Sequence, residues 1–172
     1  MMFAEGMDKF GEKKFDVEDI ARSLDDQGPY QNVFMQEMDV HNVLLAEIVR
    51  SLNELKLGFA GELTMSDAME GLMTSLFMDT IPVGWAKLAW PSKRNLVTWI
   101  LNFQQRLNQL DEWQGNPMEI PKVTWLSGLT NPQSFLTAIC QVAAQKDKLE
   151  LDKLVSLSDV LKKMTPEEVD GH

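Results

Sequence analysis

The strongest pattern in the sequence lies in residues 30–57, YQNVFMQEMDVHNVLLAEIVRSLNELKL. Mostly apolar side chains recur there in alternating steps of four and three, at Phe34, Met38, His41, Leu45, Ile48, Leu52 and Leu55. This heptad spacing places them in a seam along one side of a single long helix. Val33, Leu44 and Val49 widen the apolar side, which predicts packing against more than one neighbour. Gly58 is expected to end the helix.

Further helices are expected towards the C-terminus, separated by glycine and proline. Thr64 or Ser66 can cap the next helix, which ends before Pro82. Its apolar side carries Met69, Leu72, Met73, Leu76 and Phe77. Residues 83–90 are bounded by tryptophan and proline, and this short piece is expected to form a helical turn.

Two more amphipathic helices follow. The first is expected to start at Ser92 and to close at Gly115. Its apolar side carries Leu96, Trp99, Ile100, Phe103, Leu107, Leu110 and Trp113. Asn131 caps the second, and Pro132 suits its first helical position. The buried face of that helix carries Phe135, Leu136, Ile139, Cys140 and Ala143. Between the two helices, residues 123–126 fit either a strand or a turn.

The first and last segments of the sequence show weaker patterns. Residues 1–27 have mixed charge, and only a short helix capped by Asp16, with a narrow apolar stripe, is expected in this weakly packed lead-in. Near the other end, residues 149–157 alternate as in a strand, whereas residues 154–164 also fit a helix. The spacing alone leaves both readings open.

Composition favours a folded protein of one domain, or of one and a half. The 172 residues are 44% hydrophobic and 24% charged, and their net charge is −10. So acidic a surface disfavours binding to nucleic-acid backbones and anionic lipids. The single cysteine excludes an internal disulfide and indicates a reducing compartment, and no apolar run is long enough to span a bilayer. Eleven Met and five Trp indicate cores filled by large, adaptable side chains.

The sequence predicts no catalytic, cofactor-binding or metal-ligating residues. It contains no G-x-x-x-x-G-K-[ST] phosphate loop, no H-E-x-x-H and no C-x-x-C. His41 is expected to be a partly buried structural histidine rather than a ligand or a pH switch. Cys140 is expected to be an inert core thiol rather than a nucleophile. The aromatic stripe from Trp99 to Trp113 is expected to pack in the core, with an interaction surface as the alternative.

Three long strings in this sequence read QNVFMQEMDVHNVLLAEIVRSLNELKLGFAGELTM, SLFMDTIPVGWAKLAWPSKRNLVTWILNFQQRLNQLDEW and VTWLSGLTNPQSFLTAICQVAAQKDKLELDKL. Together they cover about residues 30–155, and they resemble the C-terminal region of dynein heavy chains. The patterns S-L-x-E-L-x-L-G-x-x-G-E-L-T and N-P-Q-S-F-L-T-A are most similar to axonemal outer-arm heavy chains. Thr130 stands where that family has a phenylalanine.

The resemblance implies an all-α layout in three parts. Residues 1–27 form a weakly ordered lead-in, residues 28–90 the helical lid of the sixth, nucleotide-free AAA+ module, and residues 91–172 a truncated C-terminal domain with room for a short strand near its end. The protein is therefore expected to be a fragment, because the family's next motif should begin where it stops. A strand at residues 149–157 has then lost its sheet partners, so this segment is expected to be helical, disordered or paired with another copy.

The resemblance also implies a non-catalytic structural or regulatory segment of a microtubule motor. The parent protein uses ATP and Mg²⁺ at other modules of its ring, and no cofactor is expected in this segment. The expected partners are the rest of the ring, the missing end of the C-terminal domain and, through the parent, microtubules and the dynein intermediate and light chains. The expected location is the cytoplasm and the cytoskeleton of the ciliary or flagellar axoneme. The alternative is a free-standing helical module that presents Trp-rich surface to a partner.

Overall fold

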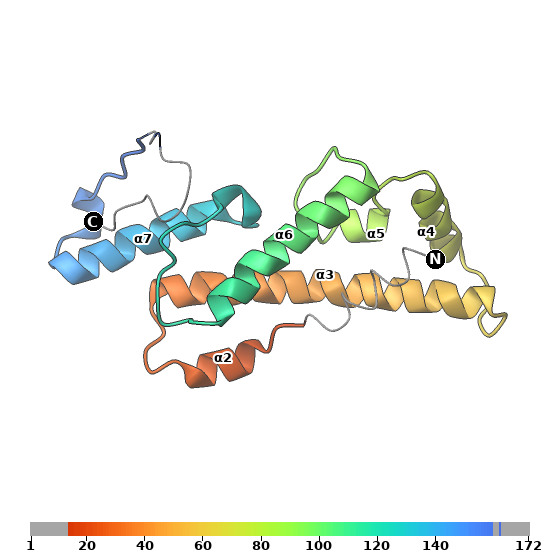
Figure 1. Cartoon of the computed structure of the whole chain (residues 1–172), viewed down its shortest axis with the longest axis horizontal. Helices are drawn as coiled ribbons and strands as arrows, with labels where there is room; N and C mark the ends of the chain where they lie inside the picture. The colour runs from red at the N-terminus through yellow and green to blue at the C-terminus, as the bar shows by residue number, and fades with distance from the viewer. Residues whose placement is uncertain (1–13, 160–161, 163–172) are drawn as a thin grey trace. The chain divides into compact units, whose positions relative to one another are not determined.

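The computed structural model describes residues 14–159 and residue 162, and Figure 1 shows only helices and connecting segments there. In sequence order the elements are α2 (Val17–Ser23), α3 (Pro29–Phe59), α4 (Asp67–Phe77), α5 (Val83–Ala86), α6 (Leu96–Gln114), η1 (Leu126–Gly128), α7 (Pro132–Asp147) and η2 (Leu151–Lys153). The described residues contain no strand, which confirms the all-α expectation.

The protein divides into two compact units that share its two longest helices. One unit comprises Met1–Asp16 and Met38–Asn108, and the other comprises Val17–Glu37 and Gln109–His172. The long helices α3 and α6 each contribute residues to both units. The units therefore do not follow the order of the sequence, because each is assembled from two separate stretches of it.

Helix α3 confirms the heptad prediction. The seam is buried from Phe34 to Leu55, and only Leu52 within it is half-buried. After the last residue of α3 the backbone reverses at Gly61, whose φ is +77°. The Gly61 N–H donates to the carbonyl of Gly58 at 3.1 Å, which satisfies one of the carbonyls left open at the helix end. Glycine suits this position because side chains are strained at a positive φ.

Helix α6 starts at Leu96 rather than at the predicted Ser92. The cap is Asn95, whose Oδ1 accepts a backbone N–H of the first turn at 3.3 Å. The side chain of Asp79 holds this cap in place, because its carboxylate accepts a hydrogen bond from Asn95 Nδ2 at 2.7 Å. Serine and asparagine are both good caps, so the choice between them depends on this contact with Asp79.

The buried face of α4 is narrower than predicted. Met69 and Leu72 are buried, whereas Met73 is 40% and Phe77 85% exposed. Residues 69 and 72 lie on one line along the helix, but Phe77 lies five residues beyond Leu72, about 140° further around it. Phe77, which the sequence places on the apolar side of this helix, is therefore exposed and lies outside the core.

The buried face of helix α7 is also narrower than the sequence predicts. It starts as predicted at Pro132, and the side chain of its cap, Asn131, accepts from the Ser134 N–H at 3.2 Å. Its buried side chains include Phe135, but Ile139 is 40% exposed. A helix that packs along one narrow line leaves its flanking apolar positions open to solvent.

The described part of the lead-in packs more firmly than its short stripe indicated. Phe15 is buried, and both of its backbone polar groups bond to the side-chain amide of Asn42 at 2.9 Å. The predicted short helix is present as α2, which follows Asp16 directly. Residues 1–13 of the lead-in lie outside the described residues.

The segment after α7 is neither the strand nor the long helix that its spacing allows. It contains only the single turn η2, and then an extended stretch in which Val155 is 79% and Leu157 89% exposed. Residues 150–159 contain no strand, so they take no part in a sheet within the described residues. Residues 160–161 and 163–172 lie outside the described part of the sequence.

Aromatic rings build the core of the unit formed by Val17–Glu37 and Gln109–His172. The ring of Phe34 on α3 lies 4.9 Å from Tyr30, 4.8 Å from Trp113 on α6 and 5.9 Å from Phe135 on α7, centroid to centroid. Such tilted and offset contacts contribute about 0.5–1.5 kcal/mol each beyond simple burial. The apolar sides predicted separately for three helices therefore meet in one aromatic cluster.

Tyr30, the only tyrosine in the sequence, predicts a loss of stability at alkaline pH. Burial raises the pKa of its hydroxyl above the ordinary value of 10.0, and the side chain of Thr124 lowers it by less. Above pH 10 the unfolded protein loses this proton and the folded protein keeps it, so stability should fall by up to about 1.4 kcal/mol per pH unit. Urea unfolding against pH tests this, with Tyr30→Phe as control. Tyrosinate absorbance should appear only with unfolding; its appearance in the folded protein near pH 10 would contradict the burial argument.

Candidate functional site

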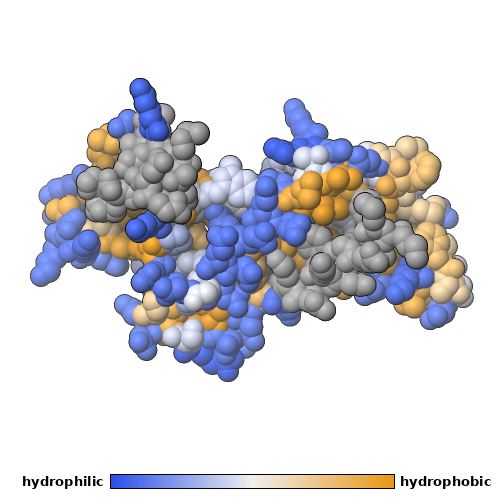
Figure 2. All heavy atoms as spheres, in the orientation of Figure 1, coloured by the Kyte–Doolittle hydropathy of each residue, from blue (hydrophilic) through white to orange (hydrophobic). Residues whose placement is uncertain are grey.

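A groove of about 370 Å³ opens among α3, α4 and α5, and its lining residues all belong to the unit that contains Met38–Asn108. Its lining combines charged side chains on α3 with Asp67 and with small and apolar side chains on α4 and α5. On the face drawn in Figure 2, apolar atoms also gather over the region of α4. Phe77, Met78 and Val83 are exposed large apolar residues in or just after α4 and at the start of α5, at 85%, 63% and 69%. Of these three, Val83 lines the groove.

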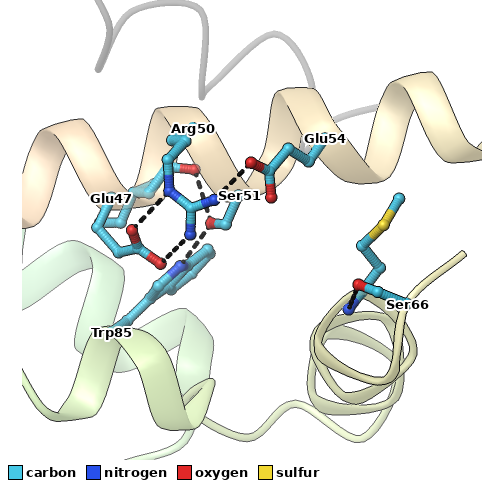
Figure 3. Close-up of polar contacts among 8 residues, drawn as sticks. Glu47, Arg50, Ser51, Glu54, Ser66 and Trp85 are labelled. Carbon is cyan, nitrogen blue, oxygen red and sulfur yellow. Dashed lines mark hydrogen bonds and ion pairs between the residues drawn. The ribbon is translucent and has the colours of Figure 1, made fainter. Parts of the chain in front are cut away.

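A cluster of one arginine and two glutamates forms the α3 side of the groove. Figure 3 shows Arg50 lying between Glu47 and Glu54 on the same helix. Its guanidinium binds the Glu47 carboxylate through two hydrogen bonds of 2.8 and 2.9 Å and also binds Glu54. Hydrogen bonds with Glu47 and Glu54 raise the pKa of Arg50, so the guanidinium stays charged. Exposed ion pairs contribute little stability, so their main effect is to fix the positions of these charges.

The α5 side of the groove is fixed by a tryptophan. Trp85 is 1% exposed, and its indole N–H donates to Ser51 Oγ at 2.9 Å, as Figure 3 shows. Ser51 in turn donates its hydroxyl proton to the Ile48 carbonyl at 3.1 Å. A buried indole N–H usually finds a partner, and here that partner ties the single-turn helix α5 to α3.

The α4 side contains a glycine with open space above it. A Cβ atom placed at Gly71 meets nothing within 4 Å. Glycine inside a helix is less favourable than alanine by about 0.8–1.0 kcal/mol, so Gly71→Ala should stabilise the protein by roughly 0.5–1 kcal/mol. Thermal unfolding measures the change. Gly128→Ala is the matched control and should destabilise the protein, because its Cβ would overlap the ring of Trp125. A lower free energy of unfolding in the Gly71→Ala variant would contradict the claim that the space above Gly71 is open.

A second cluster in the same unit holds His41 against aromatic rings. His41 is 2% exposed and stacks on Phe103 of α6 at 5.8 Å. Trp90 and Trp99 continue the stack, with centroids 5.3 Å apart. The aromatic stripe of α6 therefore packs in the interior at Trp99 and Phe103, in the manner expected. His41 is more deeply buried than the sequence indicated.

Arg106 belongs to this cluster and was not singled out from the sequence. It is 5% exposed, its guanidinium carbon lies 3.9 Å from the centroid of a Trp90 ring, and its Nε donates to Asn102 Oδ1 at 3.0 Å. An arginine over a tryptophan face is a cation–π contact. The only sign of this burial in the sequence is that Arg106 directly precedes Leu107, which lies on the apolar side of α6.

Glu37 is the second buried charge that sequence reasoning missed. It lies on α3, is 4% exposed, and its two carboxylate oxygens accept the backbone N–H groups of Thr130 and Asn131, each at 2.7 Å. These N–H groups stand at the start of α7, where a negative charge is favourable. The partners are 93 and 94 residues away along the sequence, so no local pattern could reveal the contact.

The last residue considered from the sequence, Cys140, does not form part of a candidate catalytic or metal site. Cys140 is half-exposed rather than buried in the core as predicted, because the buried line of α7 passes beside it. Over the part of the protein that the structure describes, no three His, Cys, Asp or Glu side chains gather closely enough to hold a metal ion. Within the same residues, no helix has both the length and the low polarity that crossing a membrane requires.

Comparison with known proteins identifies the family. The sequence model for the C-terminal domain of the dynein heavy chain matches residues 2–172. The protein belongs to this family. It is 44% identical over 151 residues to the ciliary dynein beta chain of Tripneustes gratilla, and 43% identical over 161 residues to the flagellar outer-arm dynein beta chain of Chlamydomonas reinhardtii. It is 40% identical over 150 residues to human dynein axonemal heavy chain 9.

The matches cover most of this sequence and very little of the relatives. They span 88%, 92% and 87% of its residues, but only 3%, 4% and 3% of the three relatives in the same order. The family resemblance drawn from the three sequence strings is therefore confirmed, including its likeness to axonemal outer-arm heavy chains. Both buried charges, Glu37 and Arg106, lie inside the strings that carried the resemblance.

Proposed function

We propose that the protein is a non-catalytic structural segment of an axonemal dynein heavy chain. The observation that carries the proposal is its membership of the family defined by the C-terminal domain of dynein heavy chains, together with helices tied to one another by buried polar contacts. Glu37 joins α3 to the start of α7, and Trp85 joins α5 to α3. Contacts of this kind make packed helices move together, which suits a segment that transmits force rather than one that performs chemistry.

Within this proposal, residues 28–90 serve as the helical lid of the sixth AAA+ module, and residues 91–172 as the first part of the C-terminal domain. The parent motor binds ATP with Mg²⁺ at other modules and acts on microtubules in the axoneme of a cilium or flagellum. The partners of this segment are the remainder of the motor ring and the rest of the C-terminal domain, with intermediate and light chains reached through the parent.

The proposal is tested in an axonemal heavy chain that bears this segment. Glu37→Ala should slow microtubule gliding while nucleotide binding at the other modules stays unchanged, because the variant weakens helix coupling and touches no nucleotide. Calorimetric titration of the 172-residue protein alone with ATP should give no binding heat. Tight ATP binding by this protein, or unchanged gliding in a variant shown to be destabilised, would contradict the proposed role.

A second candidate is a free-standing helical interaction module. The observation that favours it is the exposed apolar surface at Phe77, Met78 and Val83. Sequencing the messenger RNA on both sides of this reading frame separates the two functions. A message that continues into a complete heavy chain supports the motor segment, and a natural stop codon after His172 supports the module.

A further inference from the structure

Small side chains line the α4 side of the groove among α3, α4 and α5. Ala68, Gly71 and Ser75 lie along one side of α4, at steps of three and four residues, and each lines the groove. The space above Gly71 is open, since an added Cβ meets nothing within 4 Å. A row of small residues lets another backbone approach a helix closely. The 11 residues of α4 span about 16 Å, roughly three turns of a helix lying beside it.

The edges of the groove combine an apolar side chain with acidic ones. Val83 of α5 lines the groove and is 69% exposed. The charged lining residues are Glu47, Glu54 and Asp67 against Arg50, which gives the lining a net formal charge of −2. Arg50 is held between two of these carboxylates, so it offers little attraction to an acidic partner. The groove therefore complements a partner that is apolar on one side and basic at its flanks.

We propose that this groove binds an amphipathic helix of another polypeptide, with a row of apolar side chains flanked by Lys or Arg. The apolar row enters the space above Gly71 beside Val83, and the basic side chains reach the carboxylates of Glu54 and Asp67. A second copy of this protein is a poorer occupant, because each copy has a net charge of −10 and like charges oppose association. The proposal goes beyond the structural role above and stands on the groove alone.

The test is an NMR titration of the full protein with a synthetic helical peptide made of Leu, Ala and Lys. A matched peptide has Glu in place of every Lys. The Lys peptide should shift the resonances of the Gly71 amide and the Trp85 indole N–H, and the Glu peptide should shift neither. Gly71→Leu fills the groove and should weaken binding about tenfold or more. Gly71→Ala adds only a Cβ, and it should keep the fold and bind within about threefold of the original protein.

Charge reversal separates binding in the groove from general attraction to an acidic protein. Glu54→Lys changes the groove and should weaken binding of the Lys peptide by about tenfold. Glu112→Lys changes the net charge equally at a residue that does not line the groove, and it should alter binding by less than about twofold. The proposal is overturned by equal losses in the two variants, by equal binding of the Glu peptide, by an unchanged affinity in folded Gly71→Leu, or by a dimer of the protein that Gly71→Leu dissociates.

Discussion

Replacing Trp99 with alanine is expected to lower the free energy of unfolding by about 3–5 kcal/mol, the usual cost of removing a large buried aromatic side chain. Trp99 is 1% exposed, and its ring lies 5.3 Å from that of Trp90, 5.7 Å from that of Phe103 and 6.2 Å from that of Trp85. The variant loses these ring contacts and leaves a cavity among rigid neighbours. At about 2–4 °C per kcal/mol for a protein of this size, Tm should fall by roughly 6–20 °C.

The loss of Trp99 should also weaken the packing of Arg106. The Arg106 guanidinium is buried over a Trp90 ring, and Trp90 in turn stacks on Trp99. Without Trp99, Trp90 can tilt away, and a buried charge then loses part of its aromatic cover. Near-ultraviolet circular dichroism reports aromatic packing and should fall more than the far-ultraviolet helical signal.

Two variants make the Trp99 experiment specific. Phe77→Ala removes an aromatic ring from the same unit, but Phe77 is 85% exposed, so its free energy of unfolding should change by less than about 0.5 kcal/mol. Trp99→Phe keeps a ring in the stack and should recover part of the stability. Urea unfolding compares the three variants. Losses of similar size for Phe77→Ala and Trp99→Ala would contradict the central place of Trp99 in the core.

The helices could be predicted because their signals are local. The alternating steps of the α3 seam, the glycine Gly58 near the end of α3 and the cap at Asn131 each act within one or two turns of the backbone. These features predict the fold class, both ends of α3 to within about two residues and the start of α7, and two residues is the usual uncertainty of helix boundaries. The family likeness depended on the same stretches of sequence.

The contacts that shape the candidate site could not be predicted, because they join residues far apart in the sequence. Spacing shows that Phe77 lies on an apolar stripe of α4, but only the packed structure shows that the buried line passes through Leu72 and leaves Phe77 exposed. The open space above Gly71 depends on how α3 and α5 pack beside α4. Buried charges are equally hidden, since a charged residue in a sequence is normally solvated.

Glu37→Ala is expected to lower the free energy of unfolding by about 2–4 kcal/mol. Hydrogen bonds to a charged group contribute about 1.5–3 kcal/mol, and the two backbone N–H groups that lose their acceptor add a desolvation penalty. The buried carboxylate of Glu37 accepts the N–H groups of Thr130 and Asn131, each at 2.7 Å. Both bonds go to the backbone, so this contact places no demand on the side chain at position 130.

The charge of Glu37 is tested separately from its shape by Glu37→Gln. Glutamine keeps one acceptor oxygen, but it turns an NH₂ donor towards one of the two N–H groups, so we expect about half the loss or more to remain. Asp39→Ala, an exposed position on the same helix, is the control and should change stability by less than about 0.5 kcal/mol.

Hydrogen exchange shows where the stability is lost in the Glu37 variants. The amides of Thr130 and Asn131 should exchange faster in Glu37→Ala, and the first turn of α7 should open with them because its start is no longer held to α3. Exchange in α4 and α5 should change little, because these helices belong to the compact unit that does not contain Glu37. Uniformly faster exchange throughout the protein would mean that Glu37 supports the whole fold. Unchanged exchange at Thr130 and Asn131 would mean that the carboxylate does not anchor α7.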